Sequence, residues 1–242
     1  MGHPTRFPHG LSTATKGTVL EHWGMPDPTK YVTYWNDFTD QETATADWIE
    51  TLTGTTPTFA LTDIHGGGWL LTTTGAENDG LNLQTNGEFW LPAAAKKFWY
   101  KTRFKMSDAT QSDFLLGVAV KDTTLLGAAA GDGVTDGVFF QKDDGAATVA
   151  LYVQKDTTTG QLASGTVATL ADDTFVDLGY YYDGARYLKY YLNDAHVGTL
   201  DLTATVTTYL PDTECALAVA FLTGAAAVKT MTIDYILFSA ER

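Results

Sequence analysis

The sequence has little of several features that would point directly to a function. Cys215 is the only cysteine, so no disulfide can form within the chain and a cysteine-rich zinc site is excluded. Lysine and arginine together number 15 in 242 residues, against 29 aspartates and glutamates, which gives a net charge of -14 at pH 7. Because this charge repels phosphate backbones and anionic lipids, we expect no nucleic acid and no membrane among the partners.

Long hydrophobic runs are also absent. The N-terminal residues hold no apolar segment behind a basic patch, and no uninterrupted apolar stretch reaches the length of a membrane span. We therefore expect a soluble protein without an export signal. With 44% hydrophobic and 18% charged residues, the composition is typical of a globular chain with a buried core. The single cysteine stands in "ECALAVAF", a context that predicts a buried, inert thiol.

Residues 1–30 differ from the rest of the chain, because they are rich in proline and show neither helical nor strand periodicity. The sequence predicts an extended N-terminal arm over 1–30 and one folded domain over 31–242. An arm of this kind can dock on a partner or fold back on its own domain, and we favour docking. Its candidate anchors are the scattered apolar residues Phe7, Leu11, Leu20 and Trp23.

From residue 31 onward, short runs rich in β-branched and aromatic residues alternate with Gly, Asn and Asp. In "KKFWYKTRFKM", apolar and basic residues occupy alternate positions, so one face of a strand packs while the other meets water. Many such strands with short connections predict two packed antiparallel sheets. We expect strands near 31–38, 57–63, 68–74, 80–85, 97–106, 112–120, 136–141, 148–154, 174–183, 187–192, 196–202, 216–221 and 229–238.

The polar residues in "LGYYYDGARYLKYYLNDAHVGTL" raise the question of whether they are catalytic. Asp183-Gly184 and Asn193-Asp194 each separate two strand-like runs, and these residue types tolerate the positive φ of tight hairpins. We interpret both pairs as turns, and His196 as a residue at a strand edge.

Known catalytic patterns are not found in the sequence. Glycoside cleavage on a sandwich fold needs two carboxylates on one face, and no strand shows acids in alternation. "HGGGW" (65–69) resembles an esterase oxyanion loop, but the required G-x-S-x-G elbow is missing, so a loop or bulge is favoured. We therefore predict that the chain is not an enzyme.

Metal and sugar sites have weaker signals. The acidic, glycine-rich stretches "GDGVTDG" (131–137) and "KDDG" (142–145) lack the spacing of a calcium loop, so solvated turns are favoured over a cation site. The five histidines show no paired spacing, and we predict no metal and no cofactor. A sugar-stacking platform of Trp69, Trp90 and Trp99 is possible, but core packing is favoured.

Several blocks of the chain resemble, in order, a family of tailed-bacteriophage structural proteins. They include "RFPHGLSTATKGTVL", "MPDPTKYVTYWNDF", "KMSDATQSDFLLGVAVKDTT", "TDGVFFQKDDGAATVALYV", "DDTFVDLGYYYDG" and "KTMTIDYILFSAER". The resemblance implies an all-β, concanavalin-like or laminin-G-like jelly-roll sandwich. It also implies a capsid decoration or cement protein on the virion surface, assembled in the host cytoplasm, that binds the major capsid protein as a homo-oligomer, with a trimer favoured.

The sequence thus predicts a non-enzymatic virion protein that stabilises the head shell. One alternative is a carbohydrate-binding module on the virion, which would contact host glycans through exposed tryptophan. A second alternative is a polysaccharide-degrading enzyme on the same fold.

Overall fold

The computed structural model describes residue 19 and residues 30–39, 47–54, 56–92, 96–126, 133–156, 160–202 and 209–242. Sixteen strands lie in these ranges. In chain order they are β1 (Tyr31–Asn36), β2 (Trp48–Thr53), β3 (Thr58–Leu61), β4 (Trp69–Thr72), β5 (Gly80–Thr85), β6 (Phe98–Met106), β7 (Ser112–Ala119), β8 (Gly137–Lys142), β9 (Thr148–Lys155), β10 (Gly160–Ala163), β11 (Ala168–Thr169), β12 (Val176–Tyr182), β13 (Tyr187–Leu192), β14 (Ala195–Asp201), β15 (Ala216–Thr223) and β16 (Thr230–Glu241). Within these ranges, no helix is long and apolar enough to span a membrane.

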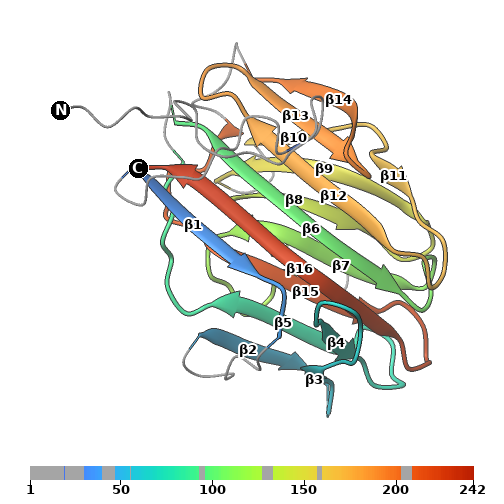
Figure 1. The fold of residues 1–242 in the computed structure, drawn as a ribbon. Helices are drawn as coiled ribbons and strands as arrows, with labels where there is room; N and C mark the ends of the chain where they lie inside the picture. Colours follow the sequence, from blue (N-terminus) through green and yellow to red (C-terminus); the bar gives the residue numbers. More distant parts are fainter. Residues whose placement is uncertain are drawn as a thin grey trace.

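The strands form two sheets that pack face to face (Figure 1). Sheet A has the order β14-β13-β12-β6-β16-β4-β3, with β1 also pairing with β16, and sheet B has the order β10-β9-β8-β7-β15-β5-β2, with β11 pairing with β9. All the strand pairs are antiparallel. The prediction of an all-β antiparallel sandwich is confirmed.

The core lies between the sheets and follows from the period-two pattern. On β6, the side chains of Phe98, Tyr100 and Phe104 are at most 1% exposed and belong to one hydrophobic cluster with residues of sheet B. Burying an aromatic side chain of this size contributes about 2–3 kcal/mol to folding. The lone thiol of Cys215 is part of the same cluster, and burial raises its pKa well above the usual range, which confirms the prediction of a buried, inert thiol.

The long strand β16 organises sheet A. On one side it pairs with β6 along most of its length, and on the other its first third pairs with β4 and its last half with β1. Its register with β6 shifts between Ile233 and Tyr235, which makes Asp234 the extra residue of a β-bulge. Because a bulge re-aims the side chains around it, this irregularity places Asp234 and Tyr235 beside the basic residues of β6.

Of the predicted arm, the structure describes only Val19 and Lys30. The Val19 side chain is 1% exposed and packs against sheet A, where its methyl groups lie near Gly179. This contact matches the folded-back alternative at that one position. The anchors Phe7, Leu11, Leu20 and Trp23 lie outside the described residues, and the division at residue 30 stays a prediction.

Candidate functional site

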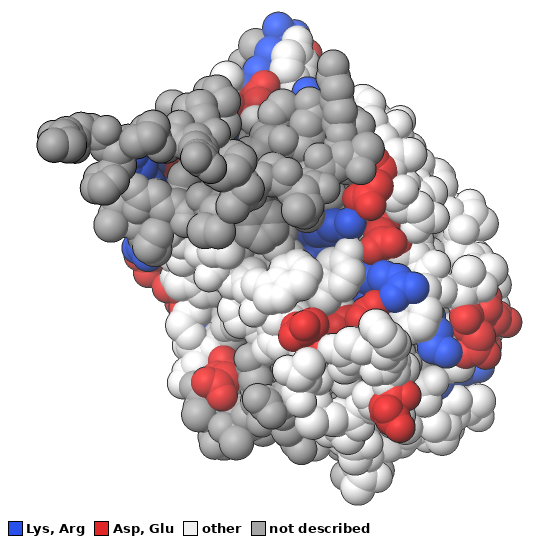
Figure 2. All heavy atoms as spheres, viewed as in Figure 1, with Lys and Arg blue, Asp and Glu red and all other residues white. Residues whose placement is uncertain are grey.

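The side of sheet A that faces away from sheet B, here called the outer face, carries aromatic and charged residues together. One row across it begins with Trp35 on β1, opposite Leu237 on β16, which lies opposite Lys101 on β6. The row continues to Gly179 on β12 and Tyr191 on β13. Figure 2 views this face and shows basic and acidic side chains side by side across its middle.

The polar part of the outer face is a set of six residues here called the charged row: Lys101, Arg103, Asp177, Asp194, Asp234 and Tyr235. The Lys101 ammonium donates a hydrogen bond to Asp194 Oδ1 at 2.8 Å and lies 4.0 Å from Asp177 Oδ1. The Tyr235 hydroxyl donates to the same oxygen of Asp177 at 2.6 Å.

The fixed charges of the row neutralise one another in part. Arg103 pairs with Asp234, the bulge residue, and its guanidinium also lies over the ring of Phe175, 4.3 Å from the ring centroid. The side chains of Lys101 and Asp234 are each 10% exposed, so their main polar contacts are with their ion-pair partners and not with water. Such a row presents carboxylate acceptors and cationic donors in a fixed arrangement.

Tyr235 keeps its proton in this setting. Burial raises the pKa of its hydroxyl far above the usual range, and the hydrogen bond to the Asp177 carboxylate raises it further. The hydroxyl is therefore a hydrogen-bond donor at every physiological pH and does not serve as a ready base.

Trp35 supplies an exposed apolar surface beside the charged row. Half of the side chain is exposed, at 50%, although it is among the largest apolar residues of the chain. Its ring stacks on that of Tyr235, with centroids 5.4 Å apart and planes at 21°. The indole is thus held flat on the outer face with one side open to solvent.

For three tryptophans, the sequence favoured core packing over a sugar-stacking platform. Trp69, Trp90 and Trp99 are at most 3% exposed, which confirms the interpretation as packing residues. Trp99 lies on the outer face, where it stacks on Tyr181 at 5.2 Å within the hydrophobic cluster that also contains Val19. The alternation in "YVTYWN" could have indicated Trp35, because Val32 and Tyr34 occupy the positions that pack inward.

The turn interpretations are confirmed. Asp183 Oδ1 accepts the amide hydrogens of Ala185, Arg186 and Tyr187, which closes the turn between β12 and β13. Asn193 and Asp194 have φ of 48° and 65° between β13 and β14. Asp194 has a second contact besides its place in the turn, because it also accepts the hydrogen bond from Lys101 in the charged row. His196 lies exposed on the edge strand β14, as predicted.

Two other sequence motifs form a loop and a turn. In "HGGGW", Gly66 and Gly67 have φ of 99° and 95°, and a Cβ on Gly67 would lie 2.5 Å from the Asp37 carbonyl oxygen, so this loop before β4 requires glycine. "KDDG" forms the turn between β8 and β9, with Gly145 at φ 75°.

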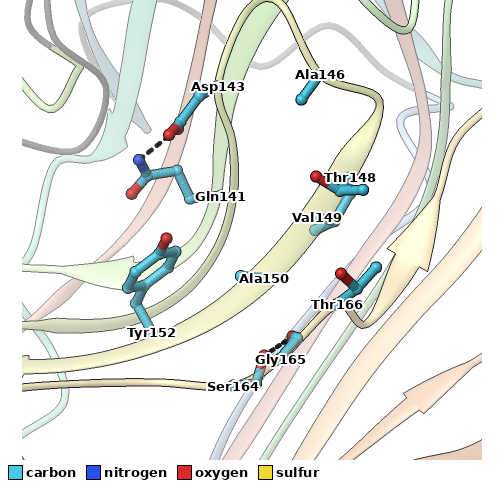
Figure 3. A pocket seen from close by; sticks show the side chains of 10 residues that line it. All are labelled: Gln141, Asp143, Ala146, Thr148, Val149, Ala150, Tyr152, Ser164, Gly165 and Thr166. Carbon is cyan, nitrogen blue, oxygen red and sulfur yellow. Dashed lines mark hydrogen bonds between the residues drawn. The ribbon is translucent and has the colours of Figure 1, made fainter.

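A hollow of about 330 Å³ lies on sheet B beside β8 and β9 (Figure 3). Its lining is mostly small or polar, and Asp143 is the charged residue in it. Gln141 donates a hydrogen bond to Asp143 at 2.8 Å, while the ring of Tyr152 stacks on Phe139. The hollow therefore has one aromatic ring that is already paired and a single acid, and it offers a ligand fewer fixed polar groups than the outer face does.

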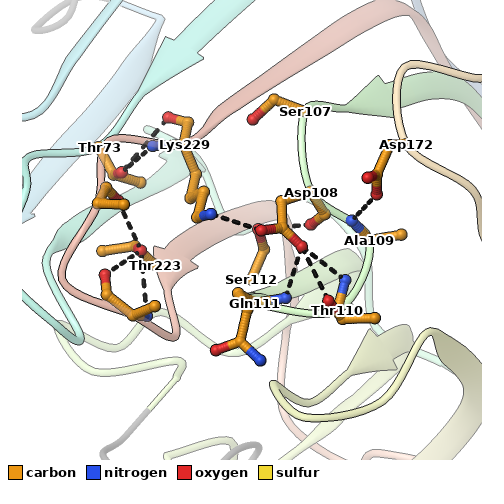
Figure 4. Close-up of polar contacts among 12 residues, drawn as sticks. Thr73, Ser107, Asp108, Ala109, Thr110, Gln111, Ser112, Asp172, Thr223 and Lys229 are labelled. Carbon is orange, nitrogen blue, oxygen red and sulfur yellow. Dashed lines mark hydrogen bonds and ion pairs between the residues drawn. The ribbon is translucent and has the colours of Figure 1, made fainter.

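At the C-terminal end of β6, an ion pair stabilises the turn that connects β6 to β7 (Figure 4). Asp108 Oδ1 accepts the amide hydrogens of Thr110 and Gln111 at 3.0 and 2.9 Å, and Oδ2 pairs with Lys229 at 2.5 Å. Burial alone would raise the pKa of Asp108, but these hydrogen bonds outweigh it and lower the pKa below its usual range. This cluster links the turn between β6 and β7 to Lys229, the residue before β16.

No protein-family model matches the chain, and no curated protein does so. Solved structures with the same fold include an endo-1,3-β-glucanase from Streptomyces sioyaensis, with 11% identity, a TM-score of 0.60 and coverage of 90% of this chain and 99% of the glucanase. An endo-β-1,4-glucuronan lyase from Trichoderma reesei has 10% identity, a TM-score of 0.55 and coverage of 85% and 94%. Peanut lectin has 16% identity, a TM-score of 0.55 and coverage of 87% and 97%. The chain is thus a concanavalin-like jelly-roll sandwich.

These comparisons correct one prediction. The prediction that the chain is not an enzyme is wrong, because the sequence pattern on which it was based does not exclude catalysis. Glucanases and a lyase share this fold with a lectin. We expected catalytic acids to alternate along one strand. The structure instead brings Asp177, Asp194 and Asp234 to one face from β12, a hairpin turn and β16.

Proposed function

We propose that this protein binds carbohydrate on the outer face of sheet A, with Trp35 as the stacking platform and the charged row as the source of hydrogen bonds. The observation that carries the proposal is the half-exposed indole of Trp35, held flat on Tyr235 immediately beside fixed carboxylates and cations.

The chemistry of a sugar ring fits this arrangement. A pyranose has an apolar C–H surface on one side and hydroxyl groups around its rim, so it needs a flat apolar partner and nearby donors and acceptors. An aromatic ring gives much contact area at low cost in conformational entropy, while preorganised polar groups fix the orientation. Trp35 provides the first, and Asp177, Lys101 and Arg103 provide the second.

The fold supports the proposal at a coarser level. A lectin and enzymes named for glucan and glucuronan have the same architecture, although at identities that carry the fold alone. We therefore attribute the specificity of this chain to the residues of its own outer face.

The proposal is tested with a panel of oligosaccharides, including β-1,3- and β-1,4-linked glucans and uronate polymers, titrated against the protein by calorimetry. Trp35→Ala is expected to weaken binding by about tenfold or more, whereas Trp35→Phe keeps part of the stacking surface and is expected to retain more affinity. Leu52→Ala is the matched control, since Leu52 is 44% exposed but lies in sheet B. If no glycan binds, or if Trp35→Ala binds as well as wild type, the proposal fails.

The same titration samples also address bond cleavage. Each glycan that binds is incubated with the protein and assayed for new reducing ends and for unsaturated sugars. Release of either product would extend the proposed function from binding to turnover, and the acids of the charged row would then be the first residues to replace.

We propose the virion role as a second candidate, on the ordered sequence blocks alone. In that role the protein would decorate the head shell through the major capsid protein, with a trimer as the favoured state. The copy number per purified particle, measured by quantitative mass spectrometry, is the test. A ratio near that of a shell subunit supports decoration, whereas a few copies per particle supports a tail or fibre position.

A further inference from the structure

Three aspartates that are far apart in the sequence meet at one end of sheet B. Asp136 immediately precedes β8 and Asp156 immediately follows β9. Because β8 and β9 are antiparallel, with Gly137 opposite Gln154, the two acids lie at the same end of the sheet. Asp212, from the connection between β14 and β15, completes the group, and one carboxylate oxygen of each lies within 4.8 Å of the others.

Asp136 is buried without full compensation. Asp136 is 4% exposed, and its Oδ1 accepts no hydrogen bond. Leaving a buried carboxylate oxygen without a donor is costly, because water no longer solvates it. A bound cation would coordinate this oxygen and remove the penalty.

The net charge of the group matches a divalent cation. Lys155 contributes one positive charge, with its ammonium 2.6 Å from Asp212 Oδ2. Three carboxylates and one ammonium leave a formal charge of -2, which one divalent cation balances. The lysine contact is to Asp212, so it does not supply the donor that Asp136 Oδ1 lacks.

We propose that Asp136, Asp156 and Asp212 bind a calcium ion that fastens this end of sheet B. Oxygen ligands without histidine or cysteine select a hard cation. Calcium accepts six to eight oxygen ligands in a flexible geometry, whereas magnesium demands a near-ideal octahedron and keeps most of its waters, so a cluster of three carboxylates from separate segments favours calcium. Backbone carbonyls and water complete the shell.

The site is independent of the outer face and joins three parts of the chain. The calcium ion ties the start of β8, the end of β9 and the segment that leads into β15. It therefore stabilises the fold whether or not the protein binds sugar. The acidic stretch 131–137, interpreted from the sequence as a solvated turn, thus contributes one ligand to a site whose other members lie elsewhere in the chain.

The test uses the full chain after treatment with EDTA and exchange into metal-free buffer. Calcium chloride titrated by calorimetry is expected to show one site, and calcium is expected to raise the melting temperature of wild type. Asp136→Asn is expected to weaken calcium binding by more than about tenfold. Asp47→Asn is the control, since Asp47 is an exposed aspartate outside the group.

Asp212→Asn provides a second variant if Asp136→Asn does not fold, because Asp212 is exposed and its replacement leaves the buried ligand intact. It is expected to weaken binding as well. Absence of calcium binding to wild type, or unchanged affinity in the aspartate variants, would overturn the site. Equal affinity for magnesium would overturn the assignment to calcium.

Discussion

The indole of Trp35 and the phenol of Tyr235 form a stacked pair on the outer face, with ring centroids 5.4 Å apart. Trp35 comes from the first strand and Tyr235 from the last, which lie side by side in sheet A. The pair connects an exposed apolar surface to the charged row, since the same Tyr235 donates its hydrogen bond to Asp177. It is therefore the structural centre of the proposed sugar site.

Replacing Tyr235 by phenylalanine separates the two roles of this residue. The ring stays beneath Trp35, but Asp177 loses the hydroxyl donor at 2.6 Å. We expect the free energy of unfolding to fall by about 1–3 kcal/mol, as for loss of a hydrogen bond to a charged group. Urea unfolding of Tyr235→Phe measures this change. A loss well below 1 kcal/mol would mean that solvent replaces the hydroxyl at Asp177.

Replacing Asp108 by alanine tests the ion pair at the far end of β6. The change leaves Lys229 and the amides of Thr110 and Gln111 without their acceptor, so we expect a loss of about 2–4 kcal/mol. Because the folded-state pKa of Asp108 lies below its unfolded value, its contribution is present above about pH 4 and disappears at lower pH.

The pH course provides the check on that prediction. Wild type and Asp108→Ala are unfolded in urea at several pH values between 7 and 3. The difference in stability is expected to be constant down to about pH 4 and to shrink below it. A difference that persists unchanged at the lowest pH would show that the ion pair contributes little and that packing accounts for the loss.

Asp113 has the opposite pH dependence. Burial raises its pKa to about 6, and the charges of Asp144 and Asp143 add to the effect against the opposing amide of Asp144 and ammonium of Lys142. In the window between about pH 4 and pH 6, the folded state therefore holds a proton that the unfolded state has lost. The contribution of Asp113 to stability falls as the pH rises through this window.

The variant Asp113→Asn is expected to lack this dependence. Relative to wild type, its stability should rise between pH 4 and pH 6 and then stay level, as measured by urea unfolding at each pH. Asp47→Asn controls for the removal of one negative charge. Parallel curves for wild type and Asp113→Asn would contradict a raised pKa at this position.

Deletion of residues 1–30 tests the contact made by Val19. Because the alternating faces of the sheets close without the arm, the sandwich is expected to stay folded. Loss of Val19 should expose part of the cluster formed with Trp99, Tyr181 and Tyr191. Acrylamide quenching of tryptophan fluorescence is expected to increase in the truncated protein and in Val19→Asp. Unchanged quenching in both would mean that Val19 does not shield Trp99 in solution.

The sheets were predictable because one face of each strand is apolar. Every strand expected from the alternating pattern is present, including β6, β12 and β16. The strands β2, β10 and β11 were missed, and they lie at or beside the edges of sheet B. An edge strand packs less of its surface, so its sequence carries a weaker pattern: in β2, Ile49 and Leu52 are exposed apolar residues.

The charged row was not predictable in the same way. Lys101 and Asp194 are 93 residues apart, and Arg103 and Asp234 are 131 residues apart, so their meeting depends on strand order and on the bulge in β16. The aspartates that form the proposed calcium site depend on strand order too. Local spacing predicts turns and single strands, whereas sites built from several strands need the register of the whole sheet.

The most direct test of carbohydrate binding is a crystal structure of the protein with an oligosaccharide that the panel identifies. We predict a sugar ring stacked on the open side of Trp35, with hydroxyl groups in hydrogen-bonding contact with the charged row. An oligosaccharide bound elsewhere, such as in the hollow beside Tyr152, with Trp35 uncovered, would contradict the account.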